Sequence, residues 1–151
     1  MKLYTIGYER SGQAALLRAL TDAGVAVLID VRELPNSRRA GFSKRALSAA
    51  LADAGMRYVH LKALGTPKEG RTAARAGRMK EFWSVVDRQL DTEAAREALD
   101  DAARVAKEGP ACLLCLEADH RVCHRDRVAA LMAERYGFEV EHLAVTTESL
   151  V

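Results

Sequence analysis

The chain has 151 residues, of which 49% are hydrophobic and 29% charged, and its 23 basic and 21 acidic side chains leave a formal net charge of +2. This balance excludes disordered and collagen-like classes, and no apolar run reaches the ~18 residues that a membrane span needs. We expect one domain over residues 1–151, with 145–151 as a loose tail. Because the N-terminal segment lacks the apolar stretch of a signal peptide, we expect a cytoplasmic protein with no membrane partner.

Apolar runs and helical periodicities alternate along the chain. They predict strands at 3–6, 25–31, 58–61, 111–116 and 138–143, and helices at 13–23, 44–54, 79–90, 92–107 and 125–136. The run at 25–31 is almost continuously apolar, which is typical of a strand buried on both faces of a parallel sheet. The segments 32–42 and 62–78 are predicted to be loops. The second is long and basic, and long loops are commonly functional.

Strands that alternate with helices favour an α/β, Rossmann-like fold: an open, mostly parallel sheet of about five strands with helices on both faces. In sequence numbering we predict the strand order 3-2-1-4-5. That order brings the turn after residue 7 and the loop after residue 116 together at the carboxyl ends of the strands. Ligands bind at this edge in open α/β sheets, in the crevice where the strand order reverses.

Arginines and helix starts at this edge predict an anion site. Arginine grips phosphate or carboxylate with two parallel hydrogen bonds, and unpaired N–H groups at helix starts attract anions. We expect ligand-binding positions at Gly7, Tyr8, Arg10, Ser11, Arg32, Ser37, Arg38, His60, His124 and Arg125. The glycines spell neither GxGxxG nor a Walker loop. The alternative is that Arg32 pairs with Asp30 or Glu117 and closes the sheet edge.

Two carboxylates at the same edge are candidates for catalysis. Glu117 follows the strand at 111–116 and Asp30 ends the strand at 25–31, so either is placed to act as a general acid or base. The alternative for Glu117 is an ion pair with Arg32 or Arg125.

Cys123 is a candidate nucleophile at the start of a helix. Basic neighbours and the helix N-terminus should lower its pKa and favour the thiolate. His120 or His60 is expected to be better placed as its base than His124, because adjacent residues of a helix do not face each other. The alternative is that Cys123 is a small buried contact.

The segment from Cys112 to His124 is rich in metal-ligand types, with Cys115, His120 and Cys123 between them. However, Cys112 and Cys115 lie three apart on a strand, so they point to opposite faces and cannot share one tetrahedral zinc. We therefore expect no metal and no cofactor. The three cysteines are expected to be free thiols, since nothing indicates export to an oxidising compartment.

Motifs at the ends of four predicted strands carry a family resemblance. They are Thr5-Ile6-Gly7-Tyr8, Leu28-Ile29-Asp30-Val31-Arg32 with Pro35, Ser37, Arg38 and Phe42, Tyr58-x-His60-Leu61-x-x-Leu64-Gly65, and Leu114-x-x-Glu117 with Cys123-His124-Arg125. With these motifs the chain resembles, from Thr5 to about His142, the family called domain of unknown function 488. The resemblance implies a Rossmann-like α/β fold and a cytoplasmic setting, but no particular reaction. It marks as signature positions Asp30, Arg32, Ser37, Arg38, Glu117, Cys123, His124 and Arg125. Tyr8 departs from the family, which often has histidine there, and so does Thr66-Pro67, where a second glycine often follows Gly65.

These features favour an α/β protein that binds or acts on a phosphate-bearing ligand, such as a nucleotide or a nucleic-acid end, at the carboxyl ends of the strands. One alternative is a non-enzymatic nucleic-acid-binding module that uses the basic loops 32–45 and 62–80. A weaker alternative is a thiol-dependent enzyme that uses Cys123. Enzymatic activity and oligomeric state stay open at this point.

Overall fold

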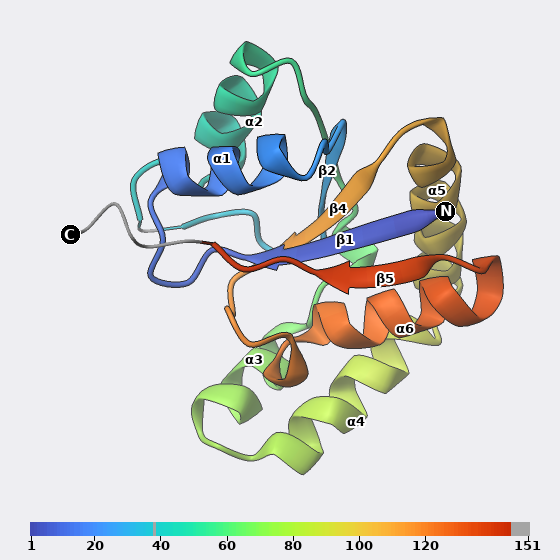
Figure 1. The fold of residues 1–151 in the computed structure, drawn as a ribbon. Helices are drawn as coiled ribbons and strands as arrows, with labels where there is room; N and C mark the ends of the chain where they lie inside the picture. The colour runs from blue at the N-terminus through green and yellow to red at the C-terminus, as the bar shows by residue number, and fades with distance from the viewer. Residues whose placement is uncertain (38, 146–151) are drawn as a thin grey trace.

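The computed structural model describes residues 1–37 and 39–145, and within them five strands form one parallel sheet. The strands are β1 (Lys2–Gly7), β2 (Val27–Asp30), β3 (Arg57–His60), β4 (Ala111–Cys115) and β5 (Glu139–His142). The helices are α1 (Gln13–Asp22), α2 (Lys44–Asp53), α3 (Lys68–Arg75), α4 (Met79–Leu90), α5 (Glu93–Glu108) and α6 (His124–Tyr136), with short 3₁₀ turns η1 (Lys62–Leu64) and η2 (His120–Val122) (Figure 1). The tail predicted at 145–151 lies, after Val145, outside the described residues.

Helices cover both faces of the sheet, as the alternation of strands and helices predicts (Figure 1). α1 and α2 pack Leu16, Leu20 and Leu47 against one face. The other face is covered by α5 and α6, which contribute Leu99 and Val128 to a larger core, and α4 packs against these two helices. The Rossmann-like α/β class is therefore confirmed, and the sheet is entirely parallel.

The strand order is β3-β2-β4-β1-β5, so the predicted order 3-2-1-4-5 is wrong. β4 lies between β2 and β1, where Leu113 is in register with both Ile29 and Thr5. All five residues of β4 are buried, as expected of a strand covered on both faces and both edges. β1 and β2 are not neighbours in the sheet. One strand position lies between them, and β4 occupies it. Local sequence patterns do not report such a gap.

The predicted loop at 62–78 is also wrong, because the segment contains η1 and α3. α3 buries only Gly70 and Ala73, so it lacks the apolar stripe that reveals a helix in a sequence. Gly70 allows α3 to lie close to α4, since a Cβ atom added there would be 2.9 Å from Cγ1 of Val85. Close packing on a neighbouring helix therefore holds α3 at the edge of the sheet.

No helix in the described part of the chain combines the length and the apolar character required to cross a bilayer.

Candidate functional site

A cavity of about 630 Å³ lies at the carboxyl ends of β1, β2 and β4, and α3 contributes to its wall. This volume is in the range of small-ligand sites. The side chains that line it are Tyr8, Arg32, Glu33, Leu34, Asn36, Ser37, Thr66, Lys68, Arg71, Ala74, Arg75, Phe82, Cys115, Leu116, Glu117 and His124. The ends of three strands and the helix α3 thus meet at one pocket, at the edge where the fold class predicts a site.

Asp30 and Arg32 form a buried ion pair at the end of β2. Nε and Nη2 of Arg32 donate to the two carboxylate oxygens of Asp30 over 2.9 and 2.7 Å. The hydroxyl of Tyr58 donates to the same carboxylate over 2.6 Å. Asp30 has no exposed surface and Arg32 is 6% exposed. The structure thus has the pairing that was the alternative to a free anion-binding Arg32, and Asp30 is enclosed by its two donors.

The remaining donor of Arg32 connects this ion pair to β1 and to the segment before α2. Nη1 donates to the hydroxyl of Tyr8 over 3.2 Å and to the carbonyl oxygen of Phe42 over 2.7 Å. The rings of Tyr8 and Phe42 stack on each other with centroids 4.5 Å apart. Burial, followed by the effect of Asp30, raises the pKa of Tyr58 well above its ordinary value. These residues form a closed network, which we call the Asp30 network: Asp30, Arg32, Tyr8, Phe42 and Tyr58.

Gly7 allows the end of β1 to approach the loop that follows β4. A Cβ atom at this position would lie 1.8 Å from the carbonyl oxygen of Glu117, so no other residue fits without a backbone shift. The contact continues beyond Gly7, because the N–H of Glu9 donates to the carbonyl of Leu116 over 2.8 Å and Oε1 of Glu9 accepts from the N–H of Ala118 over 3.1 Å. The backbone of the loop after β4 is therefore held against β1.

Arg125, in the first turn of α6, holds the same loop. It carries a positive charge and yet has no exposed surface. Its guanidinium donates to Oγ1 of Thr5 over 3.2 Å, to the carbonyl of Glu117, and to the carbonyl of Ala118 over 3.3 Å. It does not line the pocket. Arg125 thus positions the loop that carries Glu117 and does not itself face the cavity.

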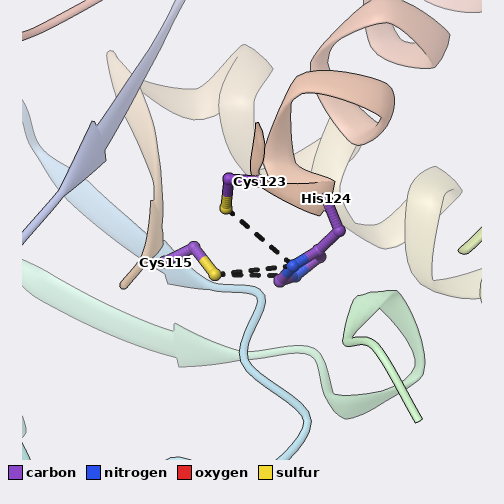
Figure 2. A group of neighbouring side chains, drawn as sticks. All are labelled: Cys115, Cys123 and His124. Carbon is purple, nitrogen blue, oxygen red and sulfur yellow. Dashed lines mark hydrogen bonds between the residues drawn. The ribbon is translucent and has the colours of Figure 1, made fainter. Parts of the chain in front are cut away.

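Three donor side chains meet where β4 ends and α6 begins, namely Cys115, Cys123 and His124, and we call them the Cys–His cluster. Figure 2 shows Cys115 from β4 and the other two from the start of α6, all pointing toward one another. Nδ1 of His124 is 3.5 Å from Sγ of Cys115 and 4.0 Å from Sγ of Cys123. Nε2 of His124 is 2.7 Å from the carbonyl oxygen of Val31. Because a carbonyl can only accept, Nε2 carries the hydrogen. Nδ1 is the ring nitrogen nearer to Sγ of Cys115, from which Nε2 lies 3.9 Å.

The two thiols of the Cys–His cluster have opposite pKa shifts. Burial, reinforced by the hydrogen bond to Cys123, raises the pKa of Cys115 well above its ordinary value. Burial also opposes ionisation of Cys123, but its hydrogen bonds with Cys115 and His124 outweigh it and lower the pKa, in the predicted direction. Cys123 has no exposed surface and does not line the pocket. A substrate in the cavity therefore has no direct path to its sulfur, which weakens the thiol-enzyme alternative.

The expectation that His120 or His60 lies closer to Cys123 than His124 is wrong. Cys123 is the N-cap of α6, with extended backbone angles (φ −119°, ψ 141°), and the helix begins at His124. The rule that adjacent helical residues do not face each other therefore does not apply to this pair. Nε2 of His60 instead lies 2.7 Å from the carbonyl oxygen of Arg32.

Glu117 lines the pocket next to the Cys–His cluster, with Oε2 3.8 Å from Sγ of Cys115. Burial and the neighbouring Cys123 thiolate raise the pKa of Glu117 to about 7. Within the described residues its carboxylate has no ion-pair partner, so the pairing with Arg32 or Arg125 that the sequence left open is absent. Of the three predicted catalytic residues, Glu117 is the one whose side chain faces the cavity.

The comparisons with known proteins give one family. A sequence model of the family described as Domain of unknown function DUF488 matches residues 13–132. The chain belongs to the DUF488 family. No curated protein and no solved structure matches it. The resemblance noted in the sequence is thereby confirmed, and all of its signature positions lie inside the matched range. Gly7 and Tyr8 precede that range, although they line or shape the same pocket in this DUF488 protein.

Of the remaining predicted ligand-binding residues of this DUF488 chain, some line the pocket and others lie outside it. Ser37 lines the pocket and accepts from the N–H of Arg39 over 3.1 Å. Arg10 and Ser11 lie outside it; Arg10 is exposed, with a left-handed backbone (φ 61°), and Ser11 is buried. Arg38 is outside the described residues. A ligand-binding role stays a prediction for each of them.

Sequence reasoning missed the contribution of the segment before and within α3. Thr66, Lys68, Arg71 and Arg75 all line the pocket. Arg71 is held by the carboxylate of Glu33 over 2.5 Å and the carbonyl of Thr66 over 2.7 Å. The run of basic residues with Pro67 and Gly70 was the available signal, but it reads equally well as an open basic loop.

Cys115 was missed because it was considered only as a partner of Cys112. The two do face opposite sides of the sheet as predicted, with Cys112 in the core under α1 and α2 and Cys115 in the core under α6. Cys115 instead meets Cys123 and His124, which stand at the start of α6, beyond η2. The alternation of side chains along β4 therefore excluded one pair and did not reveal the other.

Proposed function

We propose that this protein binds a small phosphate-bearing ligand in the cavity at the carboxyl ends of β1, β2 and β4. The observation that carries the proposal is the hydroxyl of Thr66. Thr66 lines the cavity and is only 4% exposed, and its Oγ1 is the one buried side-chain oxygen or nitrogen in the described residues that lacks a hydrogen-bond partner. A buried polar group without a partner costs free energy. Oγ1 has almost no exposed surface, so a ligand would reach it by a small rotation of the Thr66 side chain, and the new hydrogen bond would remove that cost.

The charge around the cavity favours an anion. Four cationic side chains line it, against the two carboxylates of Glu33 and Glu117. Asp30 and Glu33 already pair with two of the cations. Lys68 and Arg75 have no ion-pair partner in the described part of the chain and are exposed at the rim, so they are the groups available to a ligand phosphate.

The start of α3 adds backbone donors in the same place. Pro67 precedes the helix as its N-cap, and no side chain caps it. The first N–H groups of a helix lack intrahelical partners and favour anions. Since Thr66 and Lys68 on either side of Pro67 line the cavity, these donors stand beside the unpartnered hydroxyl.

A small ligand is better supported than a long nucleic-acid surface. The nucleic-acid alternative depends on residues 62–80 forming an open basic loop, whereas Lys68, Arg71 and Arg75 belong to a helix in the pocket wall. A phosphorylated nucleic-acid end carries the same chemistry as a free nucleotide, and the experiment separates the two.

The test is calorimetric titration of the reduced chain with inorganic phosphate, a nucleoside monophosphate and a short 5′-phosphorylated oligonucleotide, all in the presence of a metal chelator. We expect the monophosphate to bind at one site and to raise the melting temperature. Binding only to the oligonucleotide, with a steep decrease as salt rises, would favour the nucleic-acid alternative. No binding of any phosphate compound would overturn the proposal.

Variants locate the site. Thr66→Val keeps the shape and removes the hydroxyl, so we expect monophosphate affinity to fall about 5- to 10-fold while the free protein becomes no less stable. The double variant Lys68→Ala/Arg75→Ala should weaken binding by about 10-fold or more. Lys107→Ala, which removes an equally exposed cation from the last turn of α5, is the matched control and should leave the affinity unchanged.

A further inference from the structure

The donor atoms of the Cys–His cluster have the spacing of a metal site. Sγ of Cys115, Sγ of Cys123 and Nδ1 of His124 all lie within 4.8 Å of one another, and the two sulfur–nitrogen distances are 3.5 and 4.0 Å. Around a tetrahedral zinc with bonds of about 2.3 Å to sulfur and about 2.0 Å to nitrogen, a sulfur and a nitrogen ligand stand about 3.5 Å apart. One ion therefore fits between the three atoms once the His124 ring tilts to aim Nδ1 at it, since Nε2 also lies 3.9 Å from Sγ of Cys115.

We propose that Cys115, Cys123 and His124 bind one zinc ion, with its fourth coordination position open to the cavity beside Glu117. Two thiolates and one imidazole form a soft donor set that suits zinc, and three protein ligands with one open position are characteristic of zinc sites that act on bound molecules. Cys115 and His124 line the cavity, whereas Cys123 lies behind them. The open position therefore faces the cavity and not the core.

The histidine is oriented as metal-binding histidines usually are. Its Nε2–H donates to the carbonyl of Val31 over 2.7 Å, which fixes the ring and leaves Nδ1 as the free lone pair. A hydrogen bond of this kind on the second ring nitrogen fixes the tautomer and strengthens the ligand. The chain thus supplies three ligand atoms from β4 and α6 and an orienting group from the end of β2.

A second group of metal-ligand types, His120, Asp126 and His142, has a geometry that argues against a metal. The two imidazole rings are stacked with centroids 3.5 Å apart and planes 1° from parallel. Imidazole binds a metal in the plane of its ring, so an ion in the plane of one of these rings would lie well outside the plane of the other. Nδ1 of His120 is instead 2.6 Å from Asp126, and Nδ1 of His142 is 2.6 Å from Oγ1 of Thr5. A variant of this group, His120→Ala, therefore serves as a control for the zinc-binding measurements.

The zinc site goes beyond the proposed function and does not depend on it. Phosphate compounds also bind to zinc, so the two are tested under different conditions. Phosphate binding is measured with a chelator present, and zinc binding is measured without phosphate. Failure of one measurement therefore leaves the result of the other intact.

The experiment uses the full chain, reduced and stripped of metal. Zinc is titrated in competition with a chromophoric chelator, and cobalt(II) is titrated as a spectroscopic substitute. We expect one equivalent of each to bind, with a thiolate-to-cobalt charge-transfer band and the visible bands of tetrahedral cobalt. Zinc should also raise the melting temperature, because it binds the folded state.

Five variants decide which residues hold the ion. Cys115→Ala, Cys123→Ala and His124→Ala should each lose the high-affinity equivalent. Cys112→Ala removes an equally buried thiol from the opposite face of β4 and should keep it, as should His120→Ala. Each variant is checked by circular dichroism. Because the cobalt spectrum of the unmodified chain already reports thiolate ligation, a variant that fails to fold does not remove the test.

Three results would overturn the zinc site. They are no binding of zinc or cobalt by the reduced wild-type chain, a cobalt spectrum without thiolate charge transfer, and equal loss of binding in Cys112→Ala and Cys115→Ala.

Discussion

The Asp30 network and the Cys–His cluster lie at the ends of neighbouring strands, and both contain buried polar side chains. In the Asp30 network the chain itself completes the bonding: the Asp30 carboxylate accepts from Arg32 and Tyr58, and Arg32 also donates to Tyr8 and Phe42. In the Cys–His cluster Nδ1 of His124 lies 3.5 and 4.0 Å from the two sulfurs, and Sγ of Cys115 also lies 3.8 Å from Oε2 of Glu117. A buried group whose bonding is complete stabilises the fold, whereas soft donor atoms that converge on one point are also suited to hold a metal ion. The comparison supports a structural role for the Asp30 network and the proposed zinc site for the Cys–His cluster.

The largest loss of stability is expected from substitutions in the Asp30 network. Arg32→Ala leaves the Asp30 carboxylate buried without its cation, and we expect the free energy of unfolding to fall by about 3–5 kcal/mol. Tyr58→Phe removes one hydrogen bond but keeps the ion pair, so its cost should be about 1.5 kcal/mol. Urea denaturation measures both. If Arg32→Ala cost less than Tyr58→Phe, the network would not have the structural role given to it.

A second prediction concerns the contact that holds the loop after β4, and with it Glu117, against β1. Gly7→Ala places a methyl group 1.8 Å from the carbonyl oxygen of Glu117, so the strand end or the loop must move. We expect a loss of about 1–3 kcal/mol, together with weaker zinc binding. Gly12→Ala is the matched control, because a Cβ atom there meets nothing within 4 Å, and it should cost less than about 1 kcal/mol. Equal costs for the two variants would contradict the close approach.

The smallest expected effect is a gain in stability, caused by Glu117→Gln, and its size depends on pH. In the metal-free protein the pKa of Glu117 is raised to about 7 from an ordinary value of 4.5, so the folded chain holds this proton more tightly than the unfolded chain. The wild type should therefore lose stability relative to Glu117→Gln as pH rises from about 4.5 to 7. Above pH 7 the variant should be more stable by about 1–2 kcal/mol, after allowance for partial exposure.

Denaturation of both chains at pH 5 and pH 8, with a chelator present, measures this difference. A stability gap that is independent of pH would show that Glu117 is not held in a desolvated position. Such a result would contradict the contrast between Asp30, whose carboxylate accepts hydrogen bonds from Arg32 and Tyr58, and Glu117, whose carboxylate has no ion-pair partner in the described residues.

Much of the fold could be predicted from the sequence, because the helices and strands, and their succession along the chain, depend on local patterns. Alternating periodicities indicated the α/β class and the helix over 92–107, and in the structure the hydroxyl of Thr92 caps α5 by accepting from the N–H of Ala95 over 3.2 Å. The position of the candidate site followed as well, since polar residues directly after the apolar run of β4 must lie at the carboxyl edge of a parallel sheet.

Tertiary structure decided the rest, because it depends on which distant segments meet. The skipped position between β1 and β2, which β4 fills, leaves no local trace in either strand. α3 is too polar to be recognised as a helix and is held by the contact of Gly70 with α4. The Cys–His cluster forms because β4 ends where α6 begins and because Cys123 is a helix cap with extended backbone. The sequence thus determined the kind of fold and the edge that carries the site, while the partners of Cys115 and His124 were set by strand order and by a single cap.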